Sequence, residues 1–137
     1  MSTALILIAD GTEEMELVYI RGGITCTSAL VKTPSQSETD ILPLAVCSRG
    51  VRIVADTFFD NLKTTEEFDL IVVPGGAKGA ETMANDERVL QMLKYQYNLG
   101  KLVGMICAGS LAAKQAQIGY GGRITSHPSV REGLLQG

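Results

Sequence analysis

The sequence predicts an α/β fold in which a mostly parallel central sheet lies between layers of helices. Its strand candidates are apolar along their whole length, which is typical of strands covered on both faces. Segments with helical spacing separate these strands, and such alternation favours a parallel sheet. The chain has 137 residues, of which 45% are hydrophobic and 20% charged. This is enough chain to bury a core, so we expect one domain over 1–137.

The first half of the chain predicts two longer strands and two short ones. Residues 4–9 are a continuous apolar run that stops at Asp10-Gly11-Thr12. Thr12 is the expected N-cap of a first helix, and acidic residues follow it, as suits a helix start. Arg21-Gly22-Gly23 predicts that this helix ends early. The other strand candidates of this half are 24–31, 44–48 and 51–55, and the polar residues 32–40 predict a loop.

In the second half of the chain, predicted strands and helices alternate more clearly. Residues 69–73 form an apolar strand that ends at Pro74-Gly75-Gly76, and 77–83 read as a Gly/Ala-rich connection. Asn85 is the expected cap of a helix whose apolar residues recur at three- and four-residue spacing until Gly100. The later expected elements are a strand at 101–106, a helix at 111–118, a short strand at 121–125 and a last helix at 129–136.

Composition argues against several classes of partner. The net charge is −3 and the sequence has no basic run, so we expect no nucleic-acid partner. No apolar stretch approaches the roughly 20 residues that cross a bilayer, and the start lacks the features of a secretory signal. We therefore expect no membrane partner and a cytoplasmic location. The three cysteines and one histidine are widely spaced, which argues against a metal site.

Cys107 is the strongest candidate for chemistry. It follows a buried strand directly and precedes a helix, with small residues beside it that permit a sharp turn. Hydrolases place nucleophiles at such an elbow. Helix N–H groups near the sulfur would lower the pKa of the thiol and raise its thiolate fraction. The alternative is a buried, inert cysteine. We interpret Cys26 and Cys47, which lie within or late in strands, as structural.

Four further residues could act with Cys107. Glu16 lies about one turn into the first helix, so its carboxylate could face the same strand ends and accept a proton. Gly75 and Gly76 could present bare N–H groups to an oxyanion, or simply make a tight turn. His127 could be a base for Cys107 or an ordinary loop histidine. We expect Glu13 and Glu14 to be exposed acids of the first helical turn.

Four ordered motifs resemble one family. They are Ala9-Asp10-Gly11-Thr12-Glu13-Glu14-Met15-Glu16, Val73-Pro74-Gly75-Gly76, Met105-Ile106-Cys107-Ala108-Gly109 and Thr125-Ser126-His127-Pro128. Together they are similar to the ThiJ/PfpI superfamily (class I glutamine amidotransferase-like domains), and within it to the subfamily of the Parkinson's-disease-linked protein deglycase. The resemblance implies a flavodoxin-like three-layer sandwich and a homodimer. It also implies that Cys107 is the nucleophile, that Glu16 hydrogen-bonds it and shuttles protons, and that His127 lies nearby. Gly75, Gly76 and Ala108 would supply backbone donors.

The resemblance implies an activity without a cofactor. The family converts methylglyoxal, a small α-oxoaldehyde, to lactate (glyoxalase III, or D-lactate dehydratase), and deglycation, oxidative-stress sensing and chaperone behaviour are attributed to it. Its proteases carry histidine directly after the cysteine, where this chain has Ala108, so we expect no peptidase. The nucleus and mitochondria are further expected locations. The first helix looks short for the family, and the chain ends at Gly137, before the last quarter of the family fold. The alternatives are therefore a redox sensor or chaperone without turnover, and an inactive truncated isoform.

Overall fold

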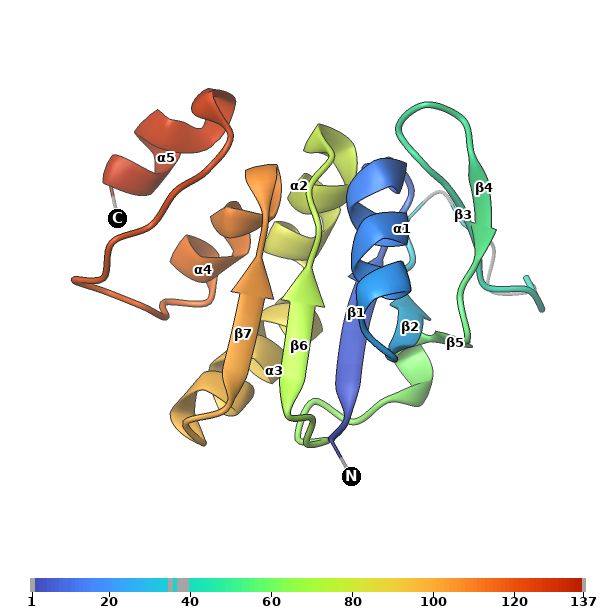
Figure 1. Ribbon diagram of the computed structural model, residues 1–137, viewed down its shortest axis with the longest axis horizontal. Coiled ribbons are helices and arrows are strands. Elements are labelled where there is room, and N and C mark those ends of the chain that lie inside the picture. The colour runs from blue at the N-terminus through green and yellow to red at the C-terminus, as the bar shows by residue number, and fades with distance from the viewer. Residues whose placement is uncertain (1, 35, 37–39, 137) are drawn as a thin grey trace.

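A five-stranded parallel sheet forms the centre of the molecule (Figure 1). The computed structural model describes residues 2–34, 36 and 40–136. The sheet has the order β5-β2-β1-β6-β7, with β1 in the middle. Its strands are β1 Ala4–Ile8, β2 Thr27–Leu30, β5 Thr57–Phe58, β6 Leu70–Val73 and β7 Leu102–Met105. Two further strands, β3 Leu44–Val46 and β4 Arg52–Val54, pair antiparallel as a separate hairpin.

Helices cover both faces of the sheet, as Figure 1 shows, with α1 on one side and α2, α3 and α4 on the other. The helices are α1 Glu14–Gly23, α2 Ala77–Asn85, α3 Glu87–Asn98, α4 Leu111–Gln115 and α5 Arg131–Leu135. Three-residue or four-residue 3₁₀ turns occur at Phe59–Asn61 (η1), Cys107–Ser110 (η2) and Pro128–Val130 (η3). The expected α/β class with a mostly parallel sheet is therefore confirmed.

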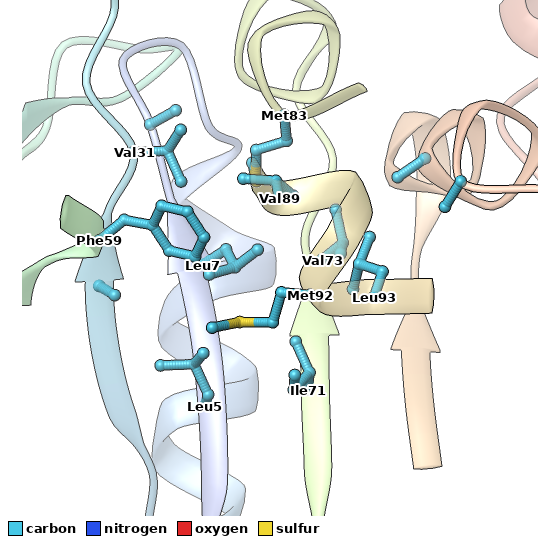
Figure 2. Packing of buried hydrophobic residues seen from close by; sticks show 14 of the residues in the cluster. Leu5, Leu7, Val31, Phe59, Ile71, Val73, Met83, Val89, Met92 and Leu93 are labelled. Carbon is cyan, nitrogen blue, oxygen red and sulfur yellow. The ribbon is translucent and has the colours of Figure 1, made fainter. Parts of the chain in front are cut away.

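The apolar runs of the strands make two cores because successive side chains point to opposite faces of the sheet. Leu5 and Leu7 face the side of α2 and α3, where they pack with Met83, Met92 and other apolar side chains (Figure 2). Ile6 and Ile8 of the same strand face α1 and the hairpin, and contribute to the second core. A strand that is apolar on both faces thus holds the two helical layers together.

The start of α1 differs from the expectation. The N-cap is Glu13 rather than Thr12, because the Glu13 carboxylate accepts the Glu16 N–H at 2.8 Å. The Thr12 hydroxyl accepts instead from the N–H of Ala9, at 2.9 Å. The predicted early end was also wrong, since α1 runs through the glycine pair to Gly23.

The predicted connection at 77–83 was also wrong, because this segment is helical and belongs to α2. Gly79 lets α2 pack tightly against the loop after β1, since a methyl group there would lie 2.7 Å from the Thr12 backbone nitrogen. The cap of α3 is Asp86 rather than Asn85, and its carboxylate accepts the N–H groups of Arg88 and Val89 at 3.0 and 3.1 Å.

The C-terminal part follows the expectation less closely. Residues 121–125 carry no strand, and Ile124 among them is largely exposed, so no strand neighbour stabilises an extended conformation there. The helix predicted at 111–118 ends at Gln115, and the last helix covers Arg131–Leu135. The predicted loop 32–40 lies partly outside the described residues, at positions 35 and 37–39. None of the described helices is long and apolar enough to cross a membrane.

Candidate functional site

The site lies where three neighbouring parallel strands end. Strands β1, β6 and β7 are adjacent in the sheet, so their carboxyl ends share one edge, at the top of Figure 1. Loops at this edge are the usual location of sites in open α/β sheets. The three segments that follow these strands carry Glu16, Gly75-Gly76 and Cys107.

Cys107 has a strained backbone. Its φ angle is +59°, a left-handed conformation that costs a residue with a side chain roughly 1–2 kcal/mol. The turn is fixed by neighbours: the Gly109 N–H donates to the Ile106 carbonyl at 2.9 Å, and the Ser110 hydroxyl donates to the Cys107 carbonyl at 2.9 Å. A methyl group on Gly109 would lie 2.5 Å from the Val73 carbonyl oxygen, so the elbow requires glycine there.

Gly75 lies between Glu16 and Cys107. The Gly75 N–H donates to Glu16 Oε2 at 2.6 Å, so this donor serves the carboxylate. A methyl group on Gly75 would lie 2.7 Å from Glu16 Oε2 and 2.8 Å from Cys107 Cβ. The Gly75 carbonyl accepts the Glu13 N–H at 3.1 Å, which ties this strand end to the start of α1. The N–H and the carbonyl of Gly75 thus both help to place Glu16 beside Cys107.

The thiol of Cys107 has a pKa above its ordinary value, whereas the sequence led us to expect a lowered one. Burial is the largest cause, and the hydrogen bond and negative charge of Glu16 raise the pKa further. The backbone N–H groups of Ala108 and Gly76 act in the opposite direction and lower it. The expected helix-end donors are therefore present, but burial and the neighbouring carboxylate outweigh them.

Gly76 is constrained by close packing as well as by its conformation. Its φ angle is +87°, and a methyl group on it would overlap the carbonyl oxygen of Gly11. Ala108 is buried in the turn that carries the cysteine. The backbone N–H groups of Gly76 and Ala108 lower the pKa of the Cys107 thiol, whereas the N–H of Gly75 donates to Glu16.

His127 has partners other than Cys107. It caps the η3 turn, where its Nδ1 lies 2.8 Å from the Ser129 hydroxyl and accepts the Ser129 N–H at 3.2 Å. The ring is exposed. Its role as a base for Cys107 stays a prediction.

Glu14 was misjudged from sequence, because it is buried rather than exposed. Its carboxylate accepts the Ser48 hydroxyl at 2.7 Å and the Arg49 N–H at 2.8 Å, both from the turn of the β3–β4 hairpin. Burial alone would raise the pKa of Glu14, but these and further backbone hydrogen bonds outweigh it and lower the pKa. Glu13, expected to be exposed, is half-buried as the cap of α1. Ser48 and Arg49 lie more than 30 residues from Glu14 in the sequence, so no local pattern predicts that Glu14 is buried.

The other two cysteines differ from Cys107. Cys47 is buried, and desolvation, together with the negative charges of Glu14, Asp10 and Glu13, raises its thiol pKa to about 11. Cys26 is half-buried in the segment between α1 and β2, just before the strand predicted to contain it, and its carbonyl accepts from the Arg21 guanidinium at 2.5 Å. Among the residues that the structure describes, no cluster of three or more His, Cys, Asp or Glu side chains could hold a metal ion.

Comparison with known proteins places this geometry in a family. The model of the DJ-1/PfpI family matches residues 2–137. Protein DJ-1alpha of Drosophila melanogaster is 38% identical over 97% of this chain and 60% of its own length. The glutathione-independent glyoxalase DJ-1 of Schizosaccharomyces pombe is 32% identical over the whole chain and 73% of its own length. The chain thus spans between three fifths and three quarters of these two relatives.

Solved structures agree with the sequence relatives. Drosophila melanogaster DJ-1beta superposes with a TM-score of 0.82 at 32% identity, over 98% of this chain and 71% of that one. Schizosaccharomyces pombe DJ-1 superposes with a TM-score of 0.80 at 30% identity, over 98% of this chain and 72% of that one. With the strand-end elbow and its neighbouring carboxylate on the same sheet edge, the chain belongs to the DJ-1/PfpI family.

Proposed function

We propose that this protein is a cofactor-independent glyoxalase that converts α-oxoaldehydes such as methylglyoxal to 2-hydroxy acids, and that also acts as a deglycase on glycated adducts. The observation that carries the proposal is the placement of the Glu16 carboxylate beside Cys107. The Gly75 N–H holds it at 2.6 Å, a methyl group on Gly75 would contact both residues, and the carboxylate raises the pKa of the thiol. A nucleophile beside a proton acceptor is the arrangement that covalent catalysis requires. The yeast relative named as a glyoxalase supports the same reaction.

In the proposed reaction, Cys107 adds as a thiolate to the aldehyde carbon, and the aldehyde oxygen takes a proton to give a hemithioacetal. Glu16 or His127 then removes the hydrogen of that carbon as a proton and returns it to the adjacent former ketone carbon. The hydroxyl proton on the first carbon passes to the former ketone oxygen, so the first carbon becomes a thioester and the second an alcohol, with no net change in oxidation. Water hydrolyses the thioester, which releases lactate from methylglyoxal and regenerates the thiol. The N–H groups of Gly76 and Ala108 are suited to bind the oxyanion.

Lactate formation from methylglyoxal tests this proposal. We expect Cys107→Ser to abolish turnover, because the hydroxyl is a far weaker nucleophile. Cys47→Ser is the matched control, since Cys47 is buried and its thiol has a pKa of about 11. Equal rates for wild type and Cys107→Ser would remove Cys107 from the mechanism.

A second function, redox sensing coupled to chaperone behaviour, is favoured by the difference between the cysteines. Cys107 is half-buried with two N–H donors near its sulfur, whereas Cys47 is buried. A protonated Glu16 would donate a hydrogen bond to a sulfinate on Cys107 and halt oxidation there. After mild peroxide, mass spectrometry should find two added oxygens on Cys107 and none on Cys26 or Cys47. Oxidation spread evenly over the three cysteines would contradict sensing at this site.

The outer surface of α1 supports a homodimer. Met15, Val18 and Tyr19 recur at helical spacing and are 75%, 57% and 85% exposed, so they form one apolar stripe. We propose that two copies associate through this stripe. Light scattering after size exclusion should give twice the chain mass for wild type and a single mass for Tyr19→Asp. A monomeric wild type that melts cooperatively would contradict the dimer, whereas aggregation without a cooperative melt would favour an inactive isoform.

A further inference from the structure

The β3–β4 hairpin packs against the sheet in the second core, and hydrogen bonds attach it to the loop that leads into α1. The Gly11 N–H donates to the Val46 carbonyl, and the Ser48 N–H donates to the Thr12 carbonyl, both at 2.9 Å. The Val46 N–H donates to the carboxylate of Asp10, also at 2.9 Å. Three hydrogen bonds therefore fix the hairpin to residues 10–12, across more than 30 positions of sequence.

Glu14 adds a buried charge to this junction. One of its oxygens accepts the Ser48 hydroxyl and the other accepts the Arg49 N–H, so both are used. The residue is only 7% exposed. A carboxylate that is removed from water needs such donors, and it leaves them unsatisfied when it is deleted. Glu14 therefore holds the hairpin turn against the first turn of α1.

The same loop places the parts of the cysteine site. Glu13 caps the N–H of Glu16 with its side chain, and its own N–H donates to the carbonyl of Gly75. Gly11 and Gly76 are so closely packed that a methyl group added to Gly76 would overlap the Gly11 carbonyl oxygen. A shift of residues 10–13 would consequently move the Glu16 carboxylate and a backbone donor relative to Cys107. The hydrogen bonds from the hairpin to residues 10–12 and to Glu14 limit such a shift.

We propose that Glu14 is a positioning residue of the Cys107 site: by binding the hairpin turn it fixes the loop that aims Glu16 at the sulfur. This inference deepens the proposed function and rests on it for its effect on turnover. Glu14 touches neither the sulfur nor the Gly75–Glu16 hydrogen bond. Its effect on the thiol is transmitted by the loop.

Glu14→Gln tests the proposal with two readouts. A glutamine removes the negative charge; its carbonyl oxygen can still accept the Arg49 N–H, whereas its N–H₂ group can only donate, so the Ser48 hydroxyl must turn to accept from it. We expect kcat for methylglyoxal to fall by about tenfold with KM within about twofold, because small misplacements of catalytic groups reduce turnover strongly. The second readout is the pH profile of Cys107 alkylation by iodoacetamide, followed on its own peptide by mass spectrometry. Its midpoint should move to lower pH, because a displaced Glu16 no longer raises the thiol pKa.

Glu87→Gln is the matched control, since Glu87 is also an acid in the first turn of a helix but is exposed. It should change neither readout. Ser48→Ala removes a single donor to Glu14 and serves as the milder variant if Glu14→Gln does not fold; it should move both readouts in the same direction.

The proposal is overturned if Glu14→Gln or Ser48→Ala lowers the melting temperature while kcat and the alkylation midpoint equal those of wild type. Glu14 would then be structural only. If wild type itself makes no lactate, the proposed function fails, and the alkylation profile alone decides whether Glu14 positions Glu16. A shifted profile supports positioning, and an unchanged one refutes it.

Discussion

Replacing Gly75 by alanine should disable the site while leaving the fold in place. The added methyl group would lie 2.8 Å from Cys107 Cβ and 2.7 Å from Glu16 Oε2. Carbon atoms in contact prefer about 3.5–4.0 Å, so either neighbour must move by about 1 Å. Such overpacking costs about 1–3 kcal/mol of folding stability. A displacement of about 1 Å at reacting groups is expected to lower turnover by about 100-fold, equivalent to about 2.7 kcal/mol in the barrier.

The assay measures kcat/KM for methylglyoxal and the rate of Cys107 alkylation in the same preparation, with a thermal melt to confirm folding. Gly104→Ala is the control, because a methyl group at this position of β7 meets its neighbours at 3.6 Å or more. Its activity should stay within about twofold of wild type, since that distance is ordinary van der Waals contact. Should Gly75→Ala keep wild-type values in both measurements, the close approach of Glu16, Gly75 and Cys107 would not matter for function.

Three further predictions concern single groups. Glu16→Gln should lower the Cys107 thiol pKa, because the carboxylate raises it, and alkylation of Cys107 at pH 7 should therefore become faster. Lactate formation should nevertheless fall by about 100-fold or more, because the glutamine cannot transfer protons. Slower alkylation at pH 7 would contradict this. Asp86→Ala removes the cap of α3 and should lower the free energy of unfolding in urea by about 1 kcal/mol, so an unchanged midpoint would show that the cap is dispensable. Hydrogen bonds from Ser28 and then from Arg21 hold the pKa of the exposed Asp56 below its ordinary 3.8, against a smaller contribution from partial desolvation. Its stabilisation therefore persists above that pH and is lost as pH falls below it. Acid unfolding should therefore be less steep in Asp56→Asn, and identical acid profiles would refute that role.

The strands were predictable because their apolar runs are local signals, and β6 and β7 appear within a residue of their expected bounds. Helix α2 was not, because Gly79 weakens the local preference for helix and its benefit is tertiary, through close packing on Thr12. Residues 121–125 show the converse: β-branched residues and flanking glycines suggest a strand, but the segment has no strand partner in the structure.

The site was predictable in its parts and not in its electrostatics. Cys107 and Gly75-Gly76 stand at strand ends, so their proximity follows from a parallel sheet. The rise in the Cys107 pKa depends on burial and on where Glu16 points. The Gly75 N–H and the Glu13 cap help to set that direction, and both contacts depend on the folded structure. Glu14 is buried by a hairpin that is distant in sequence, and no residue pattern around positions 13–16 predicts that burial.

The strand order has a consequence for how the chain folds. β1 pairs with β2 through Leu5 and Thr27, but also with β6 through Ala4 and Leu70, which are separated by most of the first half of the chain. Contacts of such sequence separation close large loops before they gain any stabilisation, so they form slowly. The thiol meets its carboxylate only when β1, β6 and β7 are all paired. Until then burial and the Glu16 carboxylate do not act on the thiol, so the raised pKa of Cys107 is a property of the assembled sheet.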